Sequence, residues 1–62
     1  HAEGLTKREE EILGYLAKGF LYKEIAGELF ISVETVRTHI RNIYEKLQVR
    51  TRTEAILKYL KH

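Results

Sequence analysis

The sequence has no cysteine, proline, methionine or tryptophan, and only four of its 62 residues are glycine. Without cysteine there can be no disulfide, zinc–thiolate site or thiol nucleophile, so stability must come from packed apolar side chains. No apolar run approaches the ~20 residues that span a membrane, and no stretch has the pattern of a secretory signal. We therefore expect a cytoplasmic protein that does not contact a membrane.

The chain is near the lower size limit at which one apolar core can hold a protein folded. We expect a single domain over residues 1–62, excised from a longer protein because the first residue is His1 rather than methionine. A chain this short leaves little room for a substrate pocket, and it has no Ser/His/Asp set, paired-carboxylate cleft or phosphate-binding loop. The sequence therefore predicts a protein that is not an enzyme and that binds no cofactor, metal or small molecule.

Apolar residues recur at helical spacing, and no stretch alternates in the way that a β-strand requires. Thr6 with Glu9, and Thr51 with Glu54, have the spacing of a capping box, in which two residues exchange side chain–backbone hydrogen bonds. Ser32 suits the N-cap of the longest apolar stripe. These signals predict an all-α fold of four helices, near residues 6–18, 22–29, 33–47 and 52–61.

Charge is unevenly distributed along the chain, although its net value is only +2. Residues 1–31 hold four basic and six acidic side chains, a balance of −2. Residues 32–52 hold five basic and two acidic side chains, a balance of +3, and residues 53–62 add +1. A basic segment in a nearly neutral chain favours a polyanionic partner such as DNA, although many solvated helices carry a similar balance.

The predicted helix at 33–47 has two different faces. The apolar face consists of Val36, Ile40, Ile43 and Leu47. If this face packs on the core, Arg37, Thr38 and Arg41 must point outward near the start of the helix. Arginine can bond the O6 and N7 atoms of guanine, and the threonine methyl can touch a thymine methyl. We therefore predict that these three side chains read bases in a major groove, against the simpler interpretation of a solvated face.

The connection between the second and third helices is very short, which is typical of two helices that cross steeply in a helix-turn-helix. Such a crossing needs a small side chain where the two backbones approach, and Ala26 occupies that position. Ile25 and Leu29 on the second helix, with Ile31 and Val36 beyond the turn, are predicted to surround it in the core.

Three stretches, LTKREEEIL, KEIAGELFIS and TVRTHIRNIYEKLQVRTRTEA, resemble the C-terminal DNA-binding domain of LuxR/NarL-type (GerE-type) transcription regulators. The resemblance covers residues 5 to 61. It implies a four-helix fold whose third helix enters the major groove of double-stranded DNA, as the output domain of a two-component response regulator. RNA polymerase is a further partner that this role implies. The resemblance also implies that Lys23, Thr35 and Lys46 contact the DNA backbone.

The start of the second helix departs from the family pattern. Leu21 stands where the family usually has a Ser or Thr cap, and Tyr22 stands where it often has Asn. Leu21 has no side-chain acceptor, so we expect this helix end to fray or to take its cap from water. The Tyr22 hydroxyl is a candidate replacement for the missing DNA-backbone contact.

The last helix carries more apolar side chains than one narrow stripe needs. Ala55, Ile56, Tyr59 and Leu60 are expected to face the core, and Leu57 lies outside that set. In the family the fourth helix often pairs two copies of the domain. We therefore predict a weak homodimer on DNA with an inverted-repeat site, through Leu57, Tyr59 and Lys61.

Two other functions remain open at this point. A sigma-factor-like domain that binds promoters would share the helix-turn-helix. A helical protein-interaction module without nucleic acid would explain the apolar last helix but would leave the Arg37, Thr38 and Arg41 face without a purpose.

Overall fold

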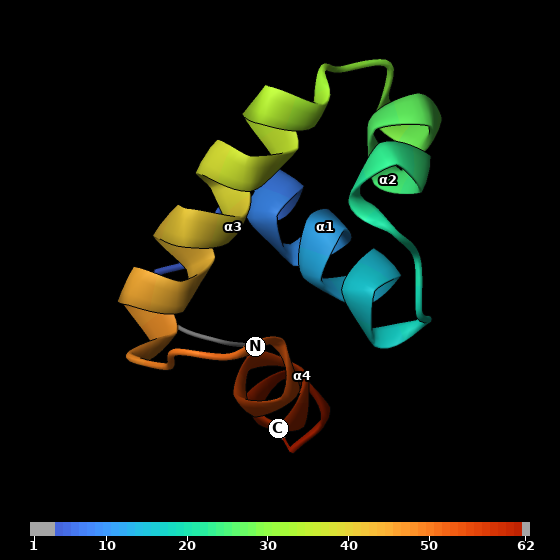
Figure 1. The fold of residues 1–62 in the computed structure, drawn as a ribbon. Coiled ribbons are helices and arrows are strands. Elements are labelled where there is room, and N and C mark those ends of the chain that lie inside the picture. Colours follow the sequence, from blue (N-terminus) through green and yellow to red (C-terminus); the bar gives the residue numbers. More distant parts are fainter. Residues whose placement is uncertain (1–3, 62) are drawn as a thin grey trace.

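The structure is a computed structural model that describes residues 4–61, and within that range it contains four helices and no strand. The helices are α1 (Lys7–Ala17), α2 (Tyr22–Leu29), α3 (Val33–Leu47) and α4 (Arg52–Leu60). In Figure 1, α3 crosses in front of α1, while α2 and α4 lie toward opposite ends of this pair. The long helix α3 packs against all three others. The predicted all-α fold is confirmed, and the helix limits agree to within one residue.

Three helix starts form as the sequence predicts. The Thr6 hydroxyl accepts from the Glu9 N–H (3.1 Å), and the Glu9 carboxylate accepts from the Thr6 N–H (3.0 Å). Thr51 and Glu54 make the same exchange at the start of α4, at 3.1 and 3.2 Å. Ser32 Oγ accepts from a backbone N–H in the first turn of α3. Local hydrogen bonds therefore fix where these helices begin.

The start of α2 is capped differently from those of the other three helices. The Leu21 N–H donates to Glu24 Oε1 at 2.7 Å, which is the half of a capping box that needs no side-chain acceptor at the N-cap. Leu21 itself makes no side-chain cap, as the sequence predicts, but its own N–H is bonded by Glu24. The Glu24 carboxylate also places negative charge at the positive end of the helix.

Two residues other than glycine end helices in the left-handed conformation, Phe30 after α2 (φ 58°) and Gln48 after α3 (φ 57°). The Phe30 and Ile31 N–H groups both donate to the Ala26 carbonyl, which closes the end of α2. Ile31 is half-buried against the core, whereas the Phe30 side chain is 93% exposed. The turn is therefore set by backbone hydrogen bonds and not by burial of Phe30.

The core lies where α1, α2 and α3 meet, with a contribution from α4. Its fully buried apolar residues are Ile12, Leu13, Leu16, Ile25, Ala26, Val36, Ile40, Ile43, Leu47 and Ala55. Ala26 is 6% exposed, as the predicted helix crossing requires. Leu29 and Ile31 are half-buried and pack against this core, whereas the expectation for Leu60 was wrong, because it is 65% exposed. The short helix α4 presents only Ala55 fully to the core, with Ile56 and Tyr59 half-buried at its edge.

Replacing Phe30 by glycine should raise the free energy of unfolding by about 0.5–1 kcal/mol. Glycine adopts a positive φ without a Cβ clash, and an exposed ring contributes little packing that could be lost. Chemical denaturation measures the change. Phe30→Val is the matched control and should be less stable than the original chain, because a β-branched residue is worst in this conformation. A glycine variant less stable than the original would contradict this account of the turn.

Candidate nucleic-acid interface

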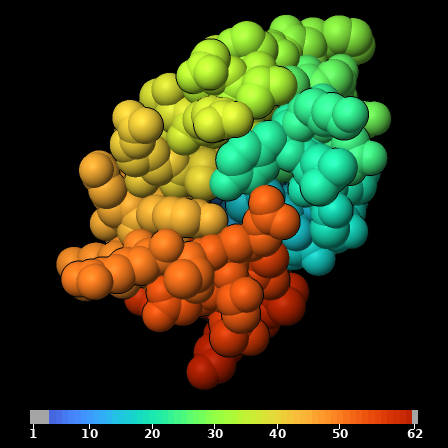
Figure 2. Space-filling view, viewed as in Figure 1, coloured from blue at the N-terminus to red at the C-terminus, as the bar shows by residue number. Residues whose placement is uncertain are grey.

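Burial on one side of α3 determines what its other side presents. Val36 and Ile43 are completely buried, and Ile40 and Leu47 are nearly so. Arg37, Thr38 and Arg41 are all exposed, as the sequence predicts. In the view of Figure 2, α3 forms the yellow part of the surface, beside the teal start of α2 and the orange start of α4. An exposed, basic helix face therefore lies on the side of the molecule turned away from α1.

The hydroxyl of Thr38 is engaged within its own helix. Thr38 Oγ1 donates to the Glu34 carbonyl at 3.1 Å. This bond leaves the methyl group as the part of the side chain that is not already bonded. A Thr38 contact with a thymine methyl fits this geometry better than hydrogen-bond donation to a base.

A shallow hollow of about 400 Å³, which we call the α2–α3 hollow, lies beside the exposed arginines. It is lined by Tyr22, Arg37, Ile40, Arg41, Tyr44, Glu45 and Val49. The structure thus brings Tyr22, at the start of α2, next to two of the predicted base-reading residues. Its open shape suits a rigid polymer passing over the surface and not an enclosed small molecule.

Lys23 and Thr35, two of the predicted backbone contacts, are exposed but do not line the α2–α3 hollow. Lys23 directly follows Tyr22 on α2. The Thr35 hydroxyl lies 2.9 Å from Ser32 Oγ, and its N–H donates to the same oxygen at 3.1 Å. Thr35 is thereby fixed in the first turn of α3.

Arg52 is an interface candidate that the sequence reasoning missed. Its guanidinium carbon lies 5.4 Å from the centre of the Tyr22 ring, within cation–π range. Burial raises the pKa of Tyr44, the Tyr22 phenol adds to this, and the positive charge of Arg52 opposes it. Tyr22, Tyr44 and Arg52 therefore form one cluster from three helices. The available sequence signal was the position of Arg52 at the end of the basic segment, immediately after the Thr51 cap.

Lys46, the last predicted backbone contact, is held by an internal ion pair. Its Nζ lies 2.8 Å from Glu9 Oε1, with the Lys46 side chain 37% exposed and that of Glu9 5% exposed. Burial raises the pKa of Glu9, but hydrogen bonds from Lys46 and the Thr6 N–H, with the charge of Lys46, outweigh burial and lower it overall. A DNA phosphate at Lys46 would have to share the ammonium with Glu9.

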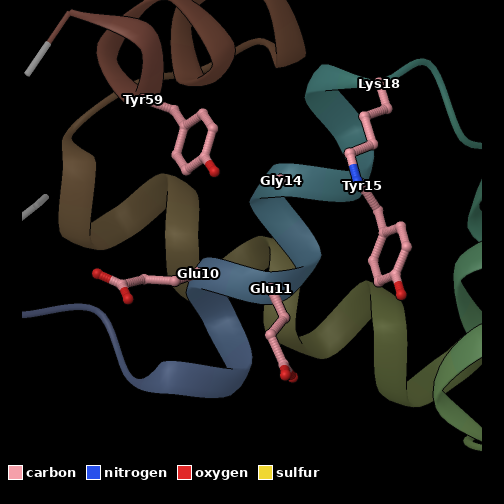
Figure 3. Close-up of a pocket in the computed structure, with 6 residues that line it drawn as sticks. All are labelled: Glu10, Glu11, Gly14, Tyr15, Lys18 and Tyr59. Carbon is pink, nitrogen blue, oxygen red and sulfur yellow. The ribbon is translucent and has the colours of Figure 1, made fainter.

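The three predicted dimer residues do not lie on one face of α4. Leu57 is 53% exposed, and Lys61 is exposed one turn further on, on the same side. The half-buried Tyr59 instead points toward Gly14 of α1, as Figure 3 shows. It lines a second hollow of about 260 Å³ with Glu10, Glu11, Gly14, Tyr15 and Lys18. The exposed surface of α4 therefore consists of Leu57, Leu60 and Lys61. Tyr59 instead packs α4 against α1.

Among residues 4–61, no helix has the length and apolar character needed to cross a bilayer. The same residues contain no group of three His, Cys, Asp or Glu side chains that could hold a metal ion. His39, beside the apolar stripe of α3, is half-buried.

Four short helices, a tight left-handed turn between α2 and α3, and an exposed basic face on α3 define a helix-turn-helix domain. Residues 3–59 match the family described as "Bacterial regulatory proteins, luxR family", and the chain belongs to this family. It is thus a DNA-binding domain of a transcription regulator, as the resemblance implied. The sigma-factor and protein-interaction alternatives receive no support.

Two curated relatives illustrate the match. The chain is 58% identical over 53 residues to the transcriptional regulatory protein LiaR of Bacillus subtilis strain 168, covering 86% of this chain and 25% of LiaR. It is 47% identical over 60 residues to the response regulator protein VraR of Staphylococcus aureus strain Mu3, covering 97% of this chain and 29% of VraR. The chain therefore spans only about a quarter of the length of these relatives.

Solved structures show the same fold. The response regulator ChrA of a heme-sensing two-component system superposes with a TM-score of 0.84 at 47% identity, over 89% of this chain and 27% of ChrA. The transcription factor GerE superposes with a TM-score of 0.86 at 46% identity, over 92% of this chain and 85% of GerE.

Replacing Glu9 by glutamine should lower the free energy of unfolding by about 1–3 kcal/mol near neutral pH. Glutamine can still accept from the Thr6 N–H, so the change removes mainly the charge that pairs with Lys46. Because folding lowers the pKa of Glu9, this stabilisation is fully present above the unfolded pKa of ~4.3. It is lost as the pH falls through the lower, folded pKa.

Thermal melts of both chains between acidic and neutral pH provide the measurement, and the difference between them should shrink in acid. Glu11→Gln is the matched control, because Glu11 is exposed and pairs only at 3.6 Å with Arg8. It should change stability by well under ~1 kcal/mol. If the two substitutions changed the free energy of unfolding equally, the Glu9–Lys46 pair could not make the proposed contribution to stability.

Proposed function

We propose that α3 reads base edges in the major groove of double-stranded DNA through Arg37, Thr38 and Arg41. The observation that carries this proposal is their exposure on α3 while the opposite face of the same helix is buried. The net charge of +3 over residues 32–52 supports it, because a helix entering the groove lies between two rows of phosphates. Direct contacts with bases would supply specificity, since phosphate contacts carry no sequence information.

Backbone contacts are proposed for Tyr22, Lys23, Thr35 and Lys46. Tyr22 is supported by its place beside Arg37 and Arg41, and Lys23 by its exposure in the adjoining position. Thr35 is supported by its fixed place in the first turn of α3. Lys46 would bind a phosphate only in addition to its contact with Glu9.

The wider role that we propose is the output domain of a two-component response regulator in the cytoplasm, with the domain spanning residues 1–62. The similarity to the response regulators VraR and ChrA supports this role. RNA polymerase is proposed as a second partner, because a transcription regulator alters the action of that enzyme. No catalytic step belongs to the proposal.

We further propose that two copies pair through α4 on an inverted-repeat site. Leu57 and Leu60 are 53% and 65% exposed, and both lie on the side of α4 open to a partner. One nine-residue helix offers an interface well below the ~1,200 Å² of stable complexes, so the free domain should be monomeric. DNA would hold two copies close together and thereby make binding cooperative.

Replacing Arg37 by alanine should cost about 1–3 kcal/mol of binding on the preferred duplex and narrow the gap between preferred and random sequences. Lys23→Ala is the matched control and should weaken binding to both duplexes alike while reducing the salt dependence. Site selection from random DNA, followed by titration of both duplexes, gives the measurement. If Arg37→Ala weakened both duplexes equally, the base-reading role would have to be abandoned.

Leu57→Asp should abolish cooperative filling of two half-sites but leave affinity for a single half-site and thermal stability nearly unchanged. The side chain is half exposed, so an aspartate there meets water in the monomer and an apolar partner only in the dimer. Leu57→Met keeps the apolar volume and should keep cooperativity. Titration of one- and two-site duplexes, with sedimentation of the free domain, decides the outcome. An aspartate variant that still fills both half-sites cooperatively would refute pairing through this surface.

A further inference from the structure

We propose that Arg52 binds a phosphate of the DNA backbone and that the Tyr22 ring holds its guanidinium in place for this contact. The inference rests on the proposed function, in which the exposed face of α3 lies in the major groove. It adds α4 to the DNA interface as a source of one contact that is independent of base sequence.

Arg52 lies against Tyr22, at the edge of the α2–α3 hollow. Arg52 is the first residue of α4 and Tyr22 the first residue of α2, and the guanidinium carbon lies 5.4 Å from the centre of the Tyr22 ring. Tyr22 in turn lines the α2–α3 hollow with Arg37 and Arg41. Figure 2 shows the orange start of α4 reaching the teal start of α2 at the edge of this surface. Arg52 therefore lies beside the proposed base-reading face, although it belongs to a different helix.

The electrostatic surroundings support the same position. Tyr44 lines the α2–α3 hollow, and burial raises its pKa while the charge of Arg52 opposes the increase. The charge of Arg52 therefore reaches a residue that lines the hollow.

The charge of the Arg52 guanidinium is available to a phosphate. Within residues 4–61, Arg52 is exposed and no carboxylate forms an ion pair with it, whereas Lys46 is paired with Glu9 and Arg8 with Glu11. The contact with the Tyr22 ring needs no hydrogen bond from the guanidinium, and within residues 4–61 its N–H groups have no hydrogen-bond acceptor. Those groups match a phosphate in a two-bond arrangement that an ammonium cannot copy.

Arg52→Gln should weaken binding to preferred and random duplexes alike, on the order of tenfold at low salt, and reduce the salt slope by about one. Arg52→Lys keeps the charge but loses the planar guanidinium that can make two bonds to a phosphate, so it should keep most of the salt slope and lose affinity a few-fold. Arg8→Gln is the matched control. It makes the same substitution at an arginine already paired on α1, and its salt slope should equal that of the original chain.

Variants of Tyr22 test the positioning. Tyr22→Phe keeps the ring and should leave the effect of Arg52→Gln at its full size. Tyr22→Leu removes the ring, so adding Arg52→Gln to it should weaken binding much less than in the original chain. A purely structural role of Tyr22 would lower the melting temperature without this non-additivity, and circular dichroism melts of each variant measure that temperature.

The outcomes separate this proposal from the proposed function. An original chain that binds no duplex at all would overturn both. A second outcome would overturn only the role of Arg52. In it, the original chain binds DNA and Arg37→Ala loses discrimination between duplexes as expected, but Arg52→Gln has the same affinity and salt dependence as Arg8→Gln. Loss on the preferred duplex alone would also overturn that role, because a phosphate contact cannot distinguish sequences. If Arg52→Gln fails to fold, Arg52→Lys decides: affinity and salt slope equal to those of the original chain would overturn the proposal.

Discussion

Burial of one stripe of α3 is the constraint on which the rest of the structure depends. Val36, Ile40, Ile43 and Leu47 are spaced so that all four meet the core on the same side of a regular helix. Once they are buried, the rotation of α3 about its own axis has no freedom left. The exposure of Arg37 and Arg41 follows from this rotation and not from any interaction of the arginines themselves.

The three basic side chains of α3 divide into two groups with opposite surroundings. Lys46, near the end of α3, is joined to the buried carboxylate of Glu9 and so contributes to holding α1 against α3. Arg37 and Arg41, near the start of α3, have no such partner within residues 4–61 and border an open hollow. A sum of charges treats these three side chains as equal, although among the described residues Arg37 and Arg41 have no carboxylate partner and Lys46 does.

The sequence was sufficient for features that depend on neighbours along the chain. The capping boxes at Thr6 and Thr51 involve partners three residues away, and the helix limits follow from them. The same holds for the exposed face of α3, which follows from helical spacing. The bond from the Leu21 N–H to Glu24 is local as well, since it is the half of a capping box that depends only on a glutamate three residues after the N-cap.

Features that join distant segments were not predictable in this way. The contact of Lys46 with Glu9 links residues 37 apart, and that of Arg52 with Tyr22 depends on how α4 is placed against α2. The exposure of Leu60 likewise depends on how little of α4 reaches the core. Spacing along one helix carries no information about these distances, so a fold was needed to reveal them.

Helix α3 is fastened at both of its ends, and this has a consequence for how it meets a ligand. Its first turn is fixed by Ser32 and by packing on α2, and its last turn by Glu9 on Lys46 and by the Lys58 ammonium, 2.7 Å from the Leu47 carbonyl. The helix α3 can neither tilt nor fray without breaking the contacts at one of its ends. Little conformational entropy therefore remains for the helix to lose on association. The free energy of its contacts is then not offset by the cost of ordering the protein, and differences between ligands appear directly in their affinities.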